Sequence, residues 1–116
     1  MDLLKDLIQG MEKIASKLEL VNNYALLSQL KADLGDFRGA RQSFKTSLQL
    51  SKETGREIME IYRRYDSAFI SLLEGNHERM LIDLDQLLEG LDKIRETNDY
   101  ADIVERLNLA VRLCLV

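Results

Sequence analysis

Apolar side chains recur every three to four residues along most of this chain, which is the spacing of one face of an α-helix. The pattern predicts six helices. They cover approximately residues 2–20, 24–34, 37–53, 56–74, 77–96 and 100 to near the end of the chain. The predicted links are only two to four residues long, and links of that length force successive helices to lie antiparallel and side by side.

Glycines and short polar side chains punctuate the pattern. Gly35 and Gly75 can end helices in a left-handed backbone conformation, and Asp36 and Asn76 can cap the helices that follow. Each helix carries an apolar stripe that we expect to face the core, and the last helix should pack against the one before it. Three of the stripes are Tyr24, Leu27, Leu30 and Leu34; Met80, Leu81, Leu84, Leu87, Leu88, Leu91 and Ile94; and Ile103, Val104, Leu107, Ala110, Val111 and Cys114.

Two stretches of the chain repeat the same signals. Gly35 and Gly75 lie 40 residues apart, and each is followed by a capping residue and by apolar positions at matching offsets. A fixed period of this length is the signature of stacked helical repeats. A hairpin of two helices cannot bury its apolar face alone, so we expect the hairpins to stack on one another.

The first stretch resembles the tetratricopeptide repeat, and a looser second unit is supported mainly by its phase. The residues that carry the resemblance are Tyr24, Leu27, Ser28, Gly35, Asp36, Ala40, Phe44 and Ser47. The resemblance implies an all-α fold, a short solenoid of antiparallel hairpins forming one domain over residues 1–116. Its parts would be a capping helix at 1–20, repeats at 21–54 and 55–97, and a partial third repeat at 98–116. A plain six-helix bundle could use the same stripes.

The resemblance also implies a binding surface, because the first helix of each unit lines a concave groove in this family. Aromatic and arginine side chains concentrate binding energy at interfaces. The expected partner-binding residues are Asn22, Leu26, Gln29, Tyr62, Arg63, Tyr65 and Phe69. The alternative is that these side chains pack between the hairpins, which is the commoner fate of such stripes.

The C-terminal helix has a second apolar stripe, formed by Leu109, Leu113 and Val116. The last helix of a stacked array normally has a polar outer face. We therefore expect this stripe to pair two copies as a homodimer or to receive a partner helix. Truncation of a longer array is the alternative.

Composition agrees with a helical domain and narrows the class of function. The chain has 22 leucines and no proline, and leucine loses little side-chain freedom in a helix. The net charge is −4, so we expect no nucleic-acid partner. No apolar run reaches the length of a membrane span. Cys114 is the only cysteine, which fits a reducing, cytoplasmic setting.

No residue pattern points to catalysis, a cofactor or a metal. His77 is the single histidine and has no evident nucleophile or carboxylate partner. Asp83, Asp85, Glu89 and Asp92 lie between leucines and are interpreted as a solvated helix face. The sequence therefore predicts a non-enzymatic module that binds a protein or peptide in a groove between helices. A structural homo-oligomer without a separate ligand is the alternative.

Overall fold

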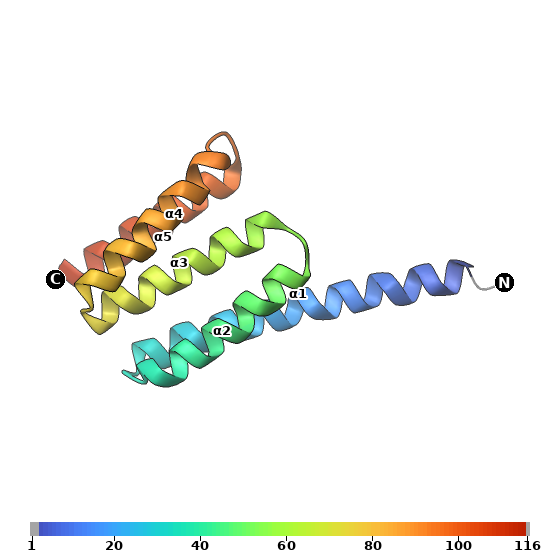
Figure 1. The fold of residues 1–116 in the computed structure, drawn as a ribbon, viewed down its shortest axis with the longest axis horizontal. Helices are drawn as coiled ribbons and strands as arrows, with labels where there is room; N and C mark the ends of the chain where they lie inside the picture. Colours follow the sequence, from blue (N-terminus) through green and yellow to red (C-terminus); the bar gives the residue numbers. More distant parts are fainter. Residues whose placement is uncertain (1–2, 116) are drawn as a thin grey trace.

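The computed structural model describes residues 3–115, apart from the side chains at positions 4, 5, 14 and 113–115. This part of the chain is all helical and contains no strand, which confirms the predicted all-α class. Its five helices are α1 (Leu3–Asp33), α2 (Phe37–Glu53), α3 (Glu57–Glu74), α4 (His77–Lys93) and α5 (Asn98–Leu115) (Figure 1).

The first two predicted helices form one continuous helix, α1, so the expected capping helix at 1–20 is not a separate element. The predicted link between them, residues 21–23, contains Asn22 and Asn23. Neither residue needs to leave the helical conformation, and no glycine or proline accompanies them. A mid-helix asparagine costs only a fraction of a kcal/mol, roughly 0.7 or less relative to alanine. The N-terminal half of α1 projects beyond the end of α2, away from the rest of the molecule (Figure 1).

The two hairpin turns have the predicted construction. Gly35 and Gly75 adopt left-handed conformations with φ of 83° and 75°. The carboxylate of Asp36 accepts a hydrogen bond from the Gly39 amide at 3.0 Å, and the side chain of Asn76 accepts one from the Arg79 amide at 3.2 Å. Each bond satisfies one of the free amide groups at a helix start.

The helices form two hairpins and a final single helix. α1 packs on α2 to form the first hairpin, α3 packs on α4 to form the second, and α3 also contacts α1, α2 and α5. α5 therefore packs on α3, whereas the sequence had suggested that it would pack on the helix before it. The main core joins α3, α4 and α5 through Ile61, Tyr65, Leu87, Leu91 and Ile103.

Burial repeats with the same 40-residue period as the turns. Each of six pairs of positions is buried in both hairpins. The pairs are Val21 and Ile61, Ala25 and Tyr65, Ser28 and Ala68, Ser43 and Asp83, Ser47 and Leu87, and Ser51 and Leu91. The two hairpins thus present equivalent faces to the core, as expected of an internal repeat.

Several predicted core positions are exposed instead. Leu27, Leu30 and Leu34 lie outside the core, and Leu34 is 85% exposed. α2 and α3 cover a different face of α1, the one formed by the small residues Val21, Ala25, Ser28 and Ala32. The predicted inward stripes also fail at Leu81, Leu88 and Val111, which are exposed. The side chain of Cys114 lies outside the described residues.

Candidate functional site

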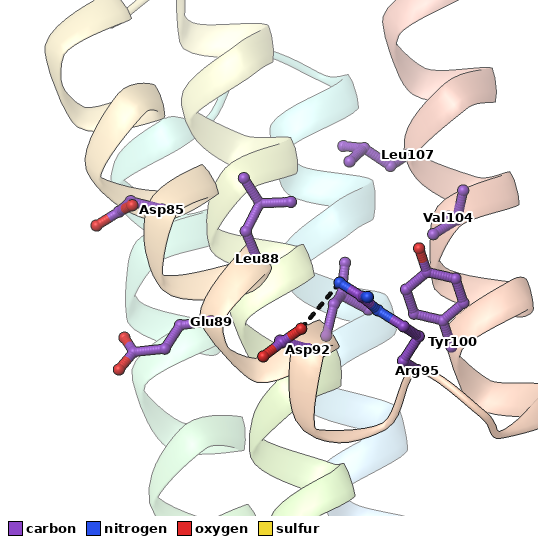
Figure 2. Close-up of a pocket in the computed structure, with 9 residues that line it drawn as sticks. Asp85, Leu88, Glu89, Asp92, Arg95, Tyr100, Val104 and Leu107 are labelled. Carbon is purple, nitrogen blue, oxygen red and sulfur yellow. Dashed lines mark hydrogen bonds and ion pairs between the residues drawn. The ribbon is translucent and has the colours of Figure 1, made fainter.

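A groove of about 730 Å³ separates α4 from α5. It exists because α5 lies along α3, leaving the facing sides of α4 and α5 uncovered. Figure 2 shows side chains from α4 and α5 on opposite sides of this opening. The groove is lined by Asp85, Leu88, Glu89, Leu91, Asp92, Arg95, Tyr100, Val104 and Leu107.

The floor and walls of the groove are apolar. Leu91 is buried in the main core, and Tyr100, Val104 and Leu107 pack against the edge of that core while keeping part of their surface free. Leu88 is 59% exposed and stands at the α4 side of the opening. The groove is therefore a continuation of the hydrophobic core into solvent, a form that suits an apolar side chain from another molecule.

The α4 rim of the groove is acidic. Asp85, Glu89 and Asp92 are all exposed on this rim. Arg95 Nη2 lies 2.9 Å from Asp92 Oδ1, an exposed ion pair of the kind that contributes little stability. Two carboxylates of the rim have no such partner among the described contacts, so the rim as a whole carries negative charge.

A polar cluster fixes α5, and with it one wall of the groove, against α3. The Tyr62 hydroxyl lies 3.0 Å from Asp99 Oδ1 and 2.7 Å from Asp102 Oδ2. Arg106 Nε bonds Asp102, and its guanidinium lies 5.5 Å from the centre of the Tyr62 ring. Burial and the two carboxylates raise the pKa of Tyr62, while the Tyr62 hydrogen bond lowers the pKa of Asp102.

The predicted partner-binding residues of α3 serve mainly internal packing. Arg63 and Tyr65 are each only 6% exposed, and Tyr62 and Phe69 are half-buried against the core. Arg63 Nε lies 2.7 Å from Asp66 Oδ2, within the same helix. Arg63 and Tyr65 thus pack between the hairpins, as in the alternative given for them, because α3 is covered by four other helices.

The predicted residues on α1 lie apart from the groove. Asn22 and Leu26 are exposed, while Gln29 is half-buried and donates to Asp66 Oδ1 at 2.8 Å. This bond joins the first hairpin to the second. Burial raises the pKa of the Asp66 carboxyl to about 6, although Arg63 and Gln29 act in the opposite direction.

The predicted C-terminal surface is described only in part. Leu109 is exposed, as the second stripe on the last helix required. It lines a shallow surface of α5 together with Ala101, Asn108 and Arg112. The side chain of Leu113 and all of Val116 lie outside the described residues, so their role stays a prediction.

The remaining polar candidates divide between surface and interior. His77 is exposed at the start of α4, as are Asp85, Glu89 and Asp92 farther along it. Asp83 differs from the expected solvated face, because it is buried and accepts a hydrogen bond from Ser71 of α3. Among the described residues, no three histidine, cysteine or acidic side chains are grouped so as to hold a metal ion. None of the helices described is both long and apolar enough to cross a membrane.

The groove was not predicted from the sequence because its apolar lining residues were assigned to the core. Leu88, Val104 and Leu107 follow the helical period as well as any buried residue does. The available signal was the number of apolar positions on α4. Leu81, Ile82 and Leu88 exceed what one core-facing stripe needs, and all three are exposed.

Comparison of the chain with protein-family models, with curated proteins and with solved structures found no match. The apolar groove and its acidic rim are therefore the features of the molecule that bear on function.

Proposed function

We propose that this protein is a non-enzymatic interaction module whose α4–α5 groove binds an amphipathic helix of a partner protein. The observation that supports the proposal is an apolar groove, continuous with the core, beside a row of exposed carboxylates. Laying the apolar face of a helix into such a groove is a recurring mode of peptide recognition. A cytoplasmic setting is part of the proposal, because the single cysteine leaves no intrachain disulfide.

The chemistry of the groove defines the partner. Apolar anchors spaced three and four residues apart would lie against Leu88, Val104 and Leu107. Lysine or arginine beside those anchors would face Asp85 and Glu89, since complementary charge at a rim aids encounter and fixes orientation. The groove runs along α4 from Asp85 to Asp92, a helical length of about 11 Å, so a partner helix of about two turns would fill it.

A repeat architecture would account for the position of the groove. We propose that α1–α2 and α3–α4 are tetratricopeptide-like units and that α5 begins a third. The shared turn conformations and the repeated burial support this assignment. In such an array the next helix would pack against α5 and α4. The partner helix would therefore take the place that the second helix of a third unit takes in such an array.

Selection from a displayed library of amphipathic helical peptides tests the proposal. We expect enriched peptides to combine leucine-type anchors with basic flanks. Leu88→Glu and Leu107→Glu should each weaken binding of a selected peptide at least tenfold, because each places a charge in the apolar contact. Ile82→Glu is the matched control, since Ile82 is 60% exposed on another face of the same helix. Equal loss in the control, or peptides that bind the Leu88→Glu variant normally, would contradict the proposal.

Self-association through α5 is the second candidate, and the exposure of Leu109 favours it. In that case the protein would be a structural homodimer without a separate peptide ligand. Leu109→Glu should then convert a dimer into a folded monomer, as measured by sedimentation and circular dichroism. A dimer that persists in this variant would exclude α5 as its interface.

A further inference from the structure

One seam of apolar and small residues runs the whole length of α1; it is buried in the C-terminal half, whereas Leu7 and Met11 in the N-terminal half are exposed. The seam follows alternating steps of three and four residues, the spacing of a heptad pattern. In the C-terminal half it consists of Val21, Ala25, Ser28 and Ala32, all buried by the rest of the molecule. In the N-terminal half it continues through positions 4, 7, 11, 14 and 18, where the sequence has leucine, methionine and isoleucine.

The N-terminal half of α1 forms a projecting arm, which we define as residues 3–20. The arm extends beyond the other helices (Figure 1). Leu7 and Met11, which lie on the seam, are 61% and 63% exposed, and Leu3 and Ile8 beside it are exposed as well. The described contact nearest its base is an exposed ion pair of 3.5 Å between Lys17 and Glu53. Large apolar side chains in a row on a projecting helix are typical of an interaction surface.

We propose that the arm pairs with the arm of a second copy of this chain, in antiparallel orientation. The seam that packs within one molecule at its C-terminal half would then pack between two molecules at its N-terminal half. The occupant of the exposed surface is thus an identical arm, and the interface is distinct from the α4–α5 groove.

The charge distribution of the arm favours a second copy over other occupants. The arm carries three basic and three acidic residues, Lys5, Lys13, Lys17, Asp6, Glu12 and Glu19. This balance removes net repulsion between identical arms. It also offers no net attraction to an anionic lipid surface or to a strongly charged protein, which amphipathic surface helices obtain from an excess of lysine and arginine.

The pattern beside the seam is compatible with self-pairing. In the heptad frame, the flanking positions of the arm hold Leu3, Ile8, Gly10, Ala15 and Lys17. Four of these five are apolar or small, so two arms could approach closely without bringing charged side chains against each other. The fifth, Lys17, already pairs with Glu53 of its own chain. The apolar face is broader than a strict two-position seam, which increases the area that pairing would bury.

The shape of the molecule sets the orientation of the two arms, and the apolar area that they bury sets the strength of the dimer. An arm of this length spans about 27 Å, and antiparallel pairing places the two folded bodies at opposite ends of the paired arms. Burial of Leu3, Leu7, Ile8 and Met11 from both copies would remove about 480–960 Å² from water, at roughly 60–120 Å² for each side chain. A specific interface needs roughly 1,000 Å², so we expect a reversible, concentration-dependent dimer.

Sedimentation equilibrium of the full chain, from low micromolar to millimolar concentration, tests this proposal. We expect a monomer–dimer equilibrium, and Leu7→Glu combined with Met11→Glu should raise the dissociation constant at least tenfold. The matched control combines Leu26→Glu with Leu34→Glu, two exposed leucines off the seam, one within α1 and one just after its end. The control should dimerise like the parent. Both variants should keep the parent's thermal transition, because none of the four residues is buried.

Small-angle scattering of the dimer tests the orientation. The monomer is 60 Å long, and antiparallel arms should give a particle clearly longer than this, with two separated masses. A protein that remains monomeric at every concentration would overturn the proposal, as would a dimer that survives the arm variant. A dimer disrupted by Leu109→Glu alone would assign pairing to α5 instead. Binding of the monomer to anionic vesicles through the arm would assign the arm to lipid.

Discussion

The first hairpin buries serine and alanine at positions where the second buries leucine and tyrosine. Ser47 and Leu87, 40 residues apart, are both fully buried. Ser51 and Leu91 are likewise both buried, and Ala25 stands where the second hairpin has Tyr65. Equivalent backbone positions are thus covered equally in the two hairpins, but by side chains of very different volume.

The difference shows two ways of closing a helical hairpin. Small residues let helix backbones approach, so that backbone and neighbouring side chains fill the interior. Large residues instead fill a wider space between the two helices with their own side chains. The buried serines cause no unpaired hydroxyl, because Ser47 donates to Phe44 O at 2.8 Å and Ser51 donates to Ser47 O at 2.8 Å. A serine satisfied by its own helix acts as a small residue.

The largest expected effect comes from emptying the core of the second hairpin. Leu87→Ala should lower the free energy of unfolding by about 2–5 kcal/mol, because Leu87 is fully buried and its removal leaves a cavity. Leu88→Ala, at the next and exposed position, should change it by less than about 0.5 kcal/mol. Urea denaturation measures both. Equal losses would mean that α4 is rotated from the orientation described.

The next effect concerns the polar contact between the hairpins. The pKa of Asp66 is raised to about 6 by burial, whereas an unfolded aspartate titrates near about 3.9. Burying the charged Asp66 carboxylate costs free energy. This cost is absent at a pH below the pKa of Asp66 in the unfolded chain and reaches its full value above its pKa in the folded protein. Relative to Asp66→Asn, the parent should therefore lose up to about 3 kcal/mol of stability as the pH rises from 4 to 7.

Denaturation of both proteins over this pH range measures the difference between their free energies of unfolding. The contributions of the other carboxyl groups are common to both proteins and largely cancel. A parent that instead gains stability over Asp66→Asn with rising pH would show that the Arg63 pair outweighs burial. The Asp66 carboxylate would then be stabilised in the fold, and the join between the hairpins would behave as an ordinary buried ion pair.

The sequence was sufficient for the features that depend on local chemistry. Helix ends and caps require particular residue types at particular positions, so they can be predicted from the sequence. This applies to the conformations of Gly35 and Gly75 and to the caps at Asp36 and Asn76. The all-α class follows from the helical period. The 40-residue spacing of the turns also indicated the repeated burial.

The features that depend on packing between helices could not be read in the same way. Periodicity marks Leu34 and Leu87 alike, although one is 85% exposed and the other fully buried. Only the placement of α2 and α3 decides which face of α1 is covered. The groove could not be predicted for the same reason. Leu88 becomes a binding candidate only because α5 packs on α3 instead of α4.

Overfilling the first hairpin tests the close approach of its helices. Ala40 is fully buried and packs with Ala32 and Ile70, so Ala40→Leu should cost about 1–3 kcal/mol through overpacking. Met80 is its counterpart in the second hairpin and is only half-buried. Met80→Leu preserves volume and should cost less than about 1.5 kcal/mol. Chemical denaturation of both variants makes the comparison, and a neutral Ala40→Leu would mean that α1 and α2 are not closely packed.

The smallest expected effect decides whether the buried serines act through size or through their hydroxyls. Ser47→Ala removes only the oxygen that bonds Phe44 O, a carbonyl within the same helix. Alanine has the higher helix propensity, so the free energy of unfolding should stay constant or rise by about 0.5 kcal/mol. Ser47→Leu should instead cost about 1–3 kcal/mol, although leucine is native at position 87. If Ser47→Ala were as damaging as Ser47→Leu, the hydroxyl itself would be required, and small volume would not explain the serines of the first hairpin.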